Sequence, residues 1–102
     1  MNQCTWGQLT FEVHPPTANW NDVAGIYIFA TWSQQHSQWI ALYIGQASSL
    51  KDRLSNHERW DEALRLGATH VHVLVVPTQA SRNSIEQSLI QACQPRLNQQ
   101  LK

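Results

Sequence analysis

The chain has few cysteines, no net charge and no long apolar run, and each shortage excludes a class of protein. Two cysteines, Cys4 and Cys93, are too few and too far apart in the sequence for a disulfide framework or a zinc site. No apolar run approaches the roughly 20 residues that a membrane-spanning helix needs. The N-terminus lacks the basic patch and apolar stretch of a secretory signal, so we expect a cytoplasmic protein.

The chain carries no excess of positive charge. Seven Lys and Arg balance seven Asp and Glu in 102 residues, whereas many nucleic-acid binders are strongly basic. All seven basic residues follow residue 50, which predicts a weak basic surface around Lys51, Arg53 and Arg59. Affinity for duplex DNA should therefore be modest and easily lost to salt. A chain of this length buries about two-thirds of its unfolded surface, so we expect one domain with one modest core.

Two strand-like runs each place a tyrosine beside a glycine. Residues 24–32 read AGIYIFATW and residues 39–45 read WIALYIG, and the polar stretch between them predicts a β-hairpin. Side chains two apart in a strand share a face, so Tyr27 lies with Gly25, and Tyr43 lies with Gly45. If the hairpin pairs in register, both phenols point into one shallow cleft, and the glycines leave room for a ligand.

A helix is predicted directly after the second of these strands. Ser48 and Ser49 are good N-cap candidates, and Asp52 follows Ser49 at capping-box spacing. Arg53 and His57 lie four residues apart, so both side chains project from one face of this helix. The segment therefore offers a cation and an imidazole near the tyrosine-bearing strands.

The rest of the chain predicts another strand and another helix. Residues 58–66 continue with helical character, residues 69–76 read as a strand, and residues 84–93 form a helix with Glu86 at the edge of its apolar stripe. The stripe consists of Ile85, Leu89 and Ala92. This order predicts an α/β fold with a small, mostly antiparallel central sheet of about three strands, flanked by helices.

Residues 1–23 are predicted to be an N-terminal extension packed on a core that spans residues 24–102. The alternating stretch 9–13 is stopped by Pro15 and Pro16. It is either an edge strand added to the sheet or a segment that packs over one end of it.

The order of these residues resembles the GIY-YIG nuclease superfamily. The matching elements are Gly-Ile-Tyr, Tyr-Ile-Gly, an arginine ten residues after the second tyrosine, a histidine four further on, a helical glutamate and a late asparagine. In this sequence they are Tyr27, Tyr43, Arg53, His57, Glu86 and Asn98. The resemblance covers roughly residues 24–98 and implies a small stand-alone member of the family. It implies a metal-dependent endonuclease that hydrolyses DNA phosphodiester bonds with a single metal ion.

The resemblance favours Tyr27 as the group that activates water, with His57 assisting and Tyr43 positioning the phosphate or the water. A free phenol titrates near 10 and a free imidazole near neutral pH, so His57 acting directly as the base stays open. A guanidinium forks onto phosphate oxygens, which suits Arg53. Glu86 is the expected ligand of Mg²⁺ or Mn²⁺, since hard divalent ions take carboxylate oxygen.

The remaining expected contacts are to substrate. Gly25, Gly45, Lys51 and Arg59 are the expected substrate-binding residues, and Asn98 is expected to orient the substrate or the groups around the metal. The expected partner is DNA, selected by its single-stranded or branched shape because the chain has no room for a separate DNA-binding module. Two alternatives stay open. One is a catalytically silent nucleic-acid-binding module, and the other is a subunit whose protein partner supplies DNA affinity.

Some residues have simpler interpretations. We interpret His70 and His72 as strand residues and not as metal ligands, because no third ligand is evident. Most of the five tryptophans are expected to pack in the core. Those expected to be available for stacking on bases are Trp32, Trp39 and Trp60.

Overall fold

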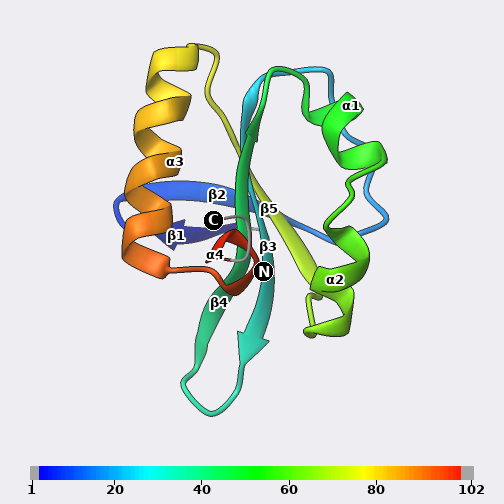
Figure 1. Ribbon diagram of the computed structural model, residues 1–102, viewed down its shortest axis with the longest axis vertical. Helices are drawn as coiled ribbons and strands as arrows, with labels where there is room; N and C mark the ends of the chain where they lie inside the picture. Colours follow the sequence, from blue (N-terminus) through cyan, green and yellow to red (C-terminus); the bar gives the residue numbers. More distant parts are fainter. Residues whose placement is uncertain (1–2, 100–102) are drawn as a thin grey trace.

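The computed structural model describes residues 3–99 as a five-stranded antiparallel sheet with helices on both faces (Figure 1). The strands follow the order β1-β2-β5-β3-β4 across the sheet. Their bounds are Gln3–Trp6 (β1), Leu9–His14 (β2), Gly25–Ser33 (β3), Gln38–Ala47 (β4) and His70–Val75 (β5). The helices are Leu50–Ser55 (α1), Trp60–Arg65 (α2), Gln79–Cys93 (α3) and Arg96–Gln99 (α4). No helix in this part of the chain is long and apolar enough to cross a membrane.

The α/β class and the antiparallel sheet are confirmed, but the expected number of about three strands is wrong. The two additional strands are β1 and β2, which form a hairpin around Gly7. Gly7 has a φ of 64°, a left-handed conformation that glycine adopts without strain. β2 pairs with β5, with His14 opposite Val71, so the strand alternative for residues 9–13 is confirmed. β2 lies between β1 and β5, so its expected place at the edge is wrong, and the two edge strands are β1 and β4. β1 has four residues, which are too few to show a clear alternating pattern.

β3 and β4 form the predicted hairpin, with one irregularity that matters for the site. Phe29 pairs with Tyr43 and Ala30 pairs with Ala41, so Leu42 is an extra residue in β4. Such a β-bulge adds one residue to the strand, so the alternation of side chains between the two faces of the sheet shifts by one position after it. As a result Tyr43 faces the same side as Phe29, while Ala41, two residues earlier, belongs to the core of the opposite side.

Each face of the sheet has its own hydrophobic core. One core is built around Tyr27, Phe29 and Tyr43 and is covered by α1 and α2, while the other is built around Phe11, Ile28 and Ile44 and is covered by α3 (Figure 1). Because β3 is central and apolar on both faces, it is buried from residue 25 to residue 30. The sheet thus holds the tyrosines on the α1–α2 side and leaves α3 on the other.

α1 has a side-chain cap at its start, whereas α3 has none. Ser49 caps α1 by accepting a hydrogen bond from the backbone N–H of Asp52, as predicted. α3 begins at Gln79, five residues before the predicted start. The apolar pattern does not predict these first turns because their buried residue is Arg82 and not an apolar side chain. Ala92 is exposed, so its predicted place on the buried stripe is wrong, and the half-buried Cys93 lies there instead.

Candidate active site

Tyr27 and Tyr43 lie side by side on the face covered by α1 and α2. Their ring centroids are 6.2 Å apart, and both side chains are buried. This confirms that the hairpin register brings the two phenols together. Tyr27 pairs directly with Gly45 across the strands.

Both glycines of the tripeptides have packing roles. A Cβ atom on Gly45 would overlap the phenol of Tyr27, and one on Gly25 would overlap the carbonyl oxygen of Leu74. The space that we expected these glycines to leave for a ligand is therefore filled by the protein itself. Gly45 allows the Tyr27 ring to pack against β4, and the role of both glycines as substrate contacts stays a prediction.

His57, in the segment between α1 and α2, completes the aromatic cluster. Its ring meets those of Tyr27, Tyr43 and Phe29 edge-on, at centroid distances of 5.4, 5.2 and 5.0 Å. Nε2 of His57 lies 2.7 Å from the hydroxyl oxygen of Tyr27. The backbone N–H of Arg59 donates to Nδ1 of His57 over 3.0 Å.

These two contacts fix the direction of the hydrogen bond between His57 and Tyr27. Since Nδ1 accepts the hydrogen bond from Arg59, the proton of a neutral imidazole must be on Nε2. Nε2–H therefore donates to the Tyr27 oxygen, and the hydroxyl hydrogen of Tyr27 is left for another acceptor. In this arrangement His57 has no lone pair with which to accept a proton from Tyr27 or from water.

Burial sets the charge states of the pair. Burial, together with the nearby charge of Arg53, lowers the pKa of His57 to about 4. Burial also raises the pKa of Tyr27 above its usual value, whereas the charge of Arg53 acts in the opposite direction. The pKa of Tyr43 is raised by burial as well. At neutral pH the site therefore holds a neutral imidazole and protonated phenols.

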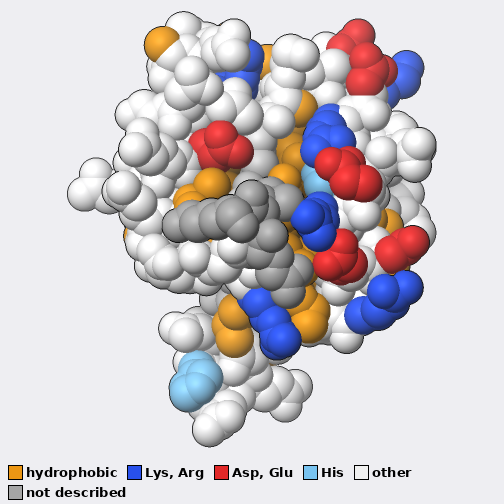
Figure 2. Space-filling model, viewed as in Figure 1, with side chains coloured by type: hydrophobic (Ala, Val, Ile, Leu, Met, Phe, Trp, Pro, Cys, Tyr) orange, Lys and Arg blue, Asp and Glu red, His pale blue; other side chains and the backbone are white. Residues whose placement is uncertain are grey.

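Arg53 is held by Glu58 in a two-point ion pair. Its two terminal nitrogens lie 2.7 and 2.8 Å from the two carboxylate oxygens. Arg59 pairs with Glu62 through a single contact of 2.7 Å. Figure 2 shows basic and acidic side chains interleaved over α1 and α2, next to a band of hydrophobic side chains. The weak basic surface expected here is thus largely neutralised by its own carboxylates.

Glu86 is positioned from α3 by a polar network at the end of β4. The side-chain amide nitrogen of Gln46 donates to Glu86 over 2.9 Å and to Asn83 over 2.6 Å. Arg82, which is buried, donates to the oxygen of Gln46 and to the carbonyl oxygens of Val76 and Pro77. The negative charge of Glu86 contributes to raising the pKa of Tyr43, so α3 brings its carboxylate within electrostatic reach of that tyrosine.

Asn98, on α4, is fully engaged by the edge strand β4. Its amide oxygen accepts from the backbone N–H of Ile44 and its amide nitrogen donates to the Ile44 carbonyl, each over 2.8 Å. A single asparagine thereby satisfies both backbone groups of an edge residue that has no strand partner on that side. The expected role in orienting substrate or metal-side groups is not supported, because both ends of the amide are already used.

The remaining candidates lie apart from the tyrosines or pack within the fold. Lys51 is exposed and borders a pocket on another side of α1. Trp60 packs edge-on against Phe29 at 4.7 Å, and Trp39 packs against His72 at 4.5 Å. Trp32 is 41% exposed, so of the three tryptophans expected to stack on bases it is the one with an accessible ring.

No family model and no curated protein matches the sequence. The GIY-YIG N-terminal endonuclease domain of UvrC from Thermotoga maritima, bound to magnesium as its catalytic divalent cation, matches with a TM-score of 0.60 and 25% identity over 76% of this chain and 84% of that one. A point mutant of that domain, also with its catalytic divalent cation, matches with the same TM-score and identity over 76% and 83%. This chain has a GIY-YIG-like domain.

The donor groups of this GIY-YIG-like domain fit a hard divalent ion better than a structural metal. No cluster of three or more His, Cys, Asp or Glu side chains occurs within residues 3–99. Glu86 is half-buried, and one of its carboxylate oxygens is held by Gln46. Mg²⁺ keeps several waters and takes one or two carboxylates together with substrate phosphate, so a lone oriented carboxylate suits it.

Three groups of the site were missed from the sequence. Glu58 follows His57 directly, so it counted only as a surface charge. Gln46 follows the Tyr-Ile-Gly tripeptide, and Arg82 precedes the predicted start of its helix. The one available signal was the i, i+4 spacing of Arg82 and Glu86, which places them on one face of a longer helix.

Replacing Asn98 by Ala should reduce the free energy of unfolding by about 2 kcal/mol, since two hydrogen bonds to Ile44 are lost at about 1 kcal/mol each. Urea unfolding followed by circular dichroism measures this difference. Gln99→Ala is the matched control in the same helix, and it removes a hydrogen bond that is exposed. Full stability of Asn98→Ala with a loss of activity would contradict a purely structural role.

Acid should destabilise the fold between pH 6.5 and about pH 4. The pKa values of His57 and His72 are both lowered to about 4 by burial, so in this range the unfolded chain binds protons that the folded chain does not. Each histidine then removes about 1.4 kcal/mol of unfolding free energy per pH unit. Urea midpoints measured from about pH 7 to about pH 5 should fall steeply. A flat profile would contradict the assignment.

Proposed function

We propose that this chain is a metal-dependent endonuclease that hydrolyses DNA phosphodiester bonds. The observation that carries the proposal is the placement of Tyr27, oriented by His57 and near Arg53, on a fold similar to a nuclease domain that binds a catalytic divalent cation. Phosphodiester hydrolysis needs an activated water, neutralised phosphate oxygens and help for the leaving oxygen. These residues supply groups suited to the first two needs.

Tyr27 is the proposed acceptor of the proton of the attacking water. It acts in its phenolate form, which is the minor form at neutral pH because burial raises the pKa of Tyr27; the Nε2–H of His57 and the charge of Arg53 stabilise this form. The water oxygen then forms a bond to phosphorus and its proton passes to Tyr27, while the bond from phosphorus to the leaving oxygen breaks, and that oxygen keeps the bonding electron pair and takes a proton from water. His57 is thus proposed as a hydrogen-bond donor to the base and not as the base.

Arg53 is proposed to bind the non-bridging oxygens of the scissile phosphate. A guanidinium forks onto two oxygens of a phosphate with the same geometry that it uses for a carboxylate. Glu86 is the proposed ligand of Mg²⁺ or Mn²⁺, and such an ion would neutralise charge at the phosphate and the leaving oxygen. Gln46 is proposed to hold Glu86 in place through its hydrogen bond, and Arg82 is proposed to hold Gln46 in turn.

Selection of DNA by shape follows from the charge balance. The net charge is zero, and Arg53 and Arg59 are paired with carboxylates. Binding of duplex by phosphate neutralisation alone would be weak under these conditions. We therefore propose a preference for single-stranded or branched DNA. The same charge balance favours a second candidate, a nuclease subunit that acquires its DNA affinity from a protein partner.

Cleavage of a panel of labelled DNA tests the proposal. The panel contains single-stranded, duplex, flap and branched DNA and supercoiled plasmid, with Mg²⁺ or Mn²⁺ at low salt. We expect metal-dependent cleavage that falls to background in Glu86→Gln and by about 10²-fold or more in Tyr27→Phe. Asp61→Asn, which removes an exposed carboxylate of α2, is the matched control and should retain activity. No cleavage of any substrate by the folded protein would overturn the stand-alone enzyme and favour the partner-dependent subunit.

Glu58→Gln should lower the KM for DNA by about two- to fivefold. The carboxylate of Glu58 occupies the fork of Arg53 that a phosphate would use, and displacing an exposed ion pair costs up to about 1 kcal/mol. Steady-state cleavage of the preferred substrate measures KM and kcat separately. Glu62→Gln removes the same charge from the neighbouring pair and should change KM less. A higher KM or a lower kcat in Glu58→Gln would mean that Glu58 positions Arg53 for catalysis.

A further inference from the structure

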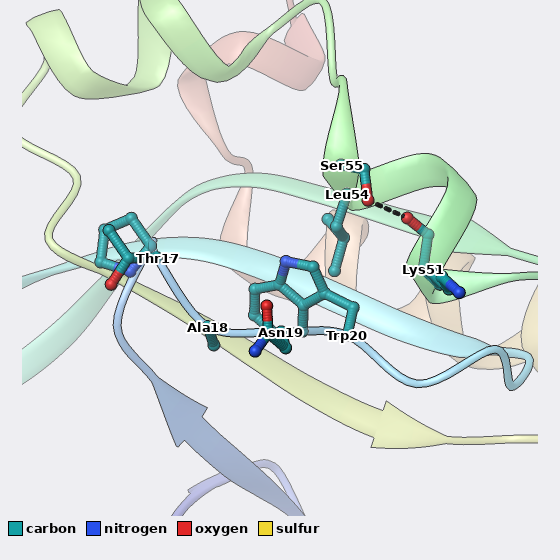
Figure 3. A pocket seen from close by; sticks show the side chains of 8 residues that line it. Thr17, Ala18, Asn19, Trp20, Lys51, Leu54 and Ser55 are labelled. Atoms are coloured by element: carbon teal, nitrogen blue, oxygen red, sulfur yellow. Dashed lines mark hydrogen bonds between the residues drawn. The ribbon is translucent and has the colours of Figure 1, made fainter.

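A pocket of about 540 Å³ lies between α1 and the loop that connects β2 to β3. Figure 3 shows the loop on one side of this pocket and α1 on the other. The residues that line this pocket include Thr17, Asn19, Trp20, Lys51, Leu54 and Ser55. Apart from Lys51, no function considered so far involves them.

The walls of this pocket are fixed by the backbone. The carbonyl oxygens of Val23 and Asn21 accept hydrogen bonds from the N–H groups of Leu50 and Lys51, over 2.8 and 3.1 Å. The loop is therefore tied to the first turn of α1. Trp20 packs against the hydrophobic core beneath it and meets the ring of His14 edge-on at 5.5 Å. A ligand would meet a preformed site, which reduces the entropic cost of binding.

The polar groups of the pocket are free to bind a ligand. Within residues 3–99, no other residue hydrogen-bonds the side chains of Thr17, Asn19, Trp20 or Lys51. They offer a hydroxyl, an amide with a donor and an acceptor, an indole N–H and one positive charge. An amide beside an aromatic ring matches the hydrogen-bonding edge and the flat face of a nucleobase, and the ammonium matches its phosphate.

The position of the pocket relates it to the proposed cleavage centre. Lys51 and Arg53 belong to the same short helix, and two residues of separation turn their side chains about 200° apart. Arg53 faces the tyrosines, while Lys51, Leu54 and Ser55 face the pocket. An α-helix with its side chains is about 10–12 Å wide, so a strand held at Arg53 reaches the pocket within a few nucleotides.

We propose that this pocket binds an unpaired nucleobase of the strand that is cut, stacked on Trp20 and held at its edge by Asn19, with the adjoining phosphate at Lys51. The inference rests on the proposed function, because it assigns the substrate that the endonuclease selects. A base inside a duplex is paired and stacked on both sides and does not enter such a pocket. Occupancy of the pocket therefore selects single-stranded or unpaired regions without a large basic surface.

Binding without cleavage tests this subsite separately from catalysis. Fluorescence anisotropy would compare a labelled oligothymidylate with an abasic oligomer of the same length, using the Glu86→Gln protein in EDTA at low salt. We expect the oligothymidylate to bind about tenfold more tightly, the size of one base stacked on an aromatic ring. Asn19→Ala and Trp20→Leu should reduce that ratio, whereas Asn21→Ala, whose side chain lies outside the pocket, should preserve it.

The charge contribution has its own matched pair of variants. Lys51→Ala should weaken both oligomers equally, and Arg65→Ala, which removes an equally exposed charge from α2, should weaken them less. If Trp20→Leu does not fold, as judged by circular dichroism, Asn19→Ala and Lys51→Ala carry the test. Equal affinity for the two oligomers, or a base preference that the Asn19 variant leaves unchanged, would overturn the subsite.

The outcomes also separate the subsite from the proposed function. Cleavage of DNA by the native protein, with no effect of the pocket variants on base preference, would overturn the subsite and leave the endonuclease standing. A base preference that depends on the pocket, in a protein that cleaves none of the DNA panel, would support the subsite and overturn the stand-alone endonuclease.

Discussion

The hydrogen bond from the backbone N–H of Arg59 to Nδ1 of His57 governs the candidate site. It occupies the only lone pair of a neutral imidazole and so places the ring proton on Nε2. That proton is aimed at the hydroxyl oxygen of Tyr27. The orientation of one peptide group between α1 and α2 therefore decides which atom of the site donates and which accepts. Burial of the imidazole, which lowers its pKa to about 4, keeps this arrangement intact across the neutral range.

The sheet makes this arrangement possible by two departures from regular pairing. The bulge at Leu42 allows Tyr43 to face the helices, while the outer part of β4 keeps its own apolar side chains in the other core. The absence of a side chain at Gly45 gives Tyr27 room to lie across β4. Asn98 then closes the open edge of β4 at Ile44, immediately beside both features. Bulge, glycine and asparagine all act on one stretch of a single strand.

The sequence predicts much of this fold because local patterns determined most of it. The hairpin and the Ser49 cap follow from alternation and capping chemistry. The shared face of the tyrosines also needs the bulge at Leu42, which alternation alone does not predict. The β1–β2 hairpin was underestimated because four residues carry little periodic signal. The start of α3 was missed because Arg82 is buried by hydrogen bonds to carbonyl groups, and that depends on the end of β5, which is distant in sequence. The engagement of Asn98 and the Arg53–Glu58 pair likewise depend on contacts that spacing alone does not reveal.

The neutral surface charge of this domain bears directly on how a DNA substrate would be recognised. A nuclease that relies on phosphate contacts gains affinity for every duplex it meets, and it loses that affinity to salt. Here the cations nearest the tyrosines are held by carboxylates, so general attraction to DNA is small. Under the proposed function, an unpaired DNA substrate would be recognised by groups that an intact duplex does not satisfy. The proposed base-binding pocket on the other side of α1 offers such groups. An unpaired base would gain stacking and hydrogen bonds in this pocket that replace those it has lost by leaving the duplex.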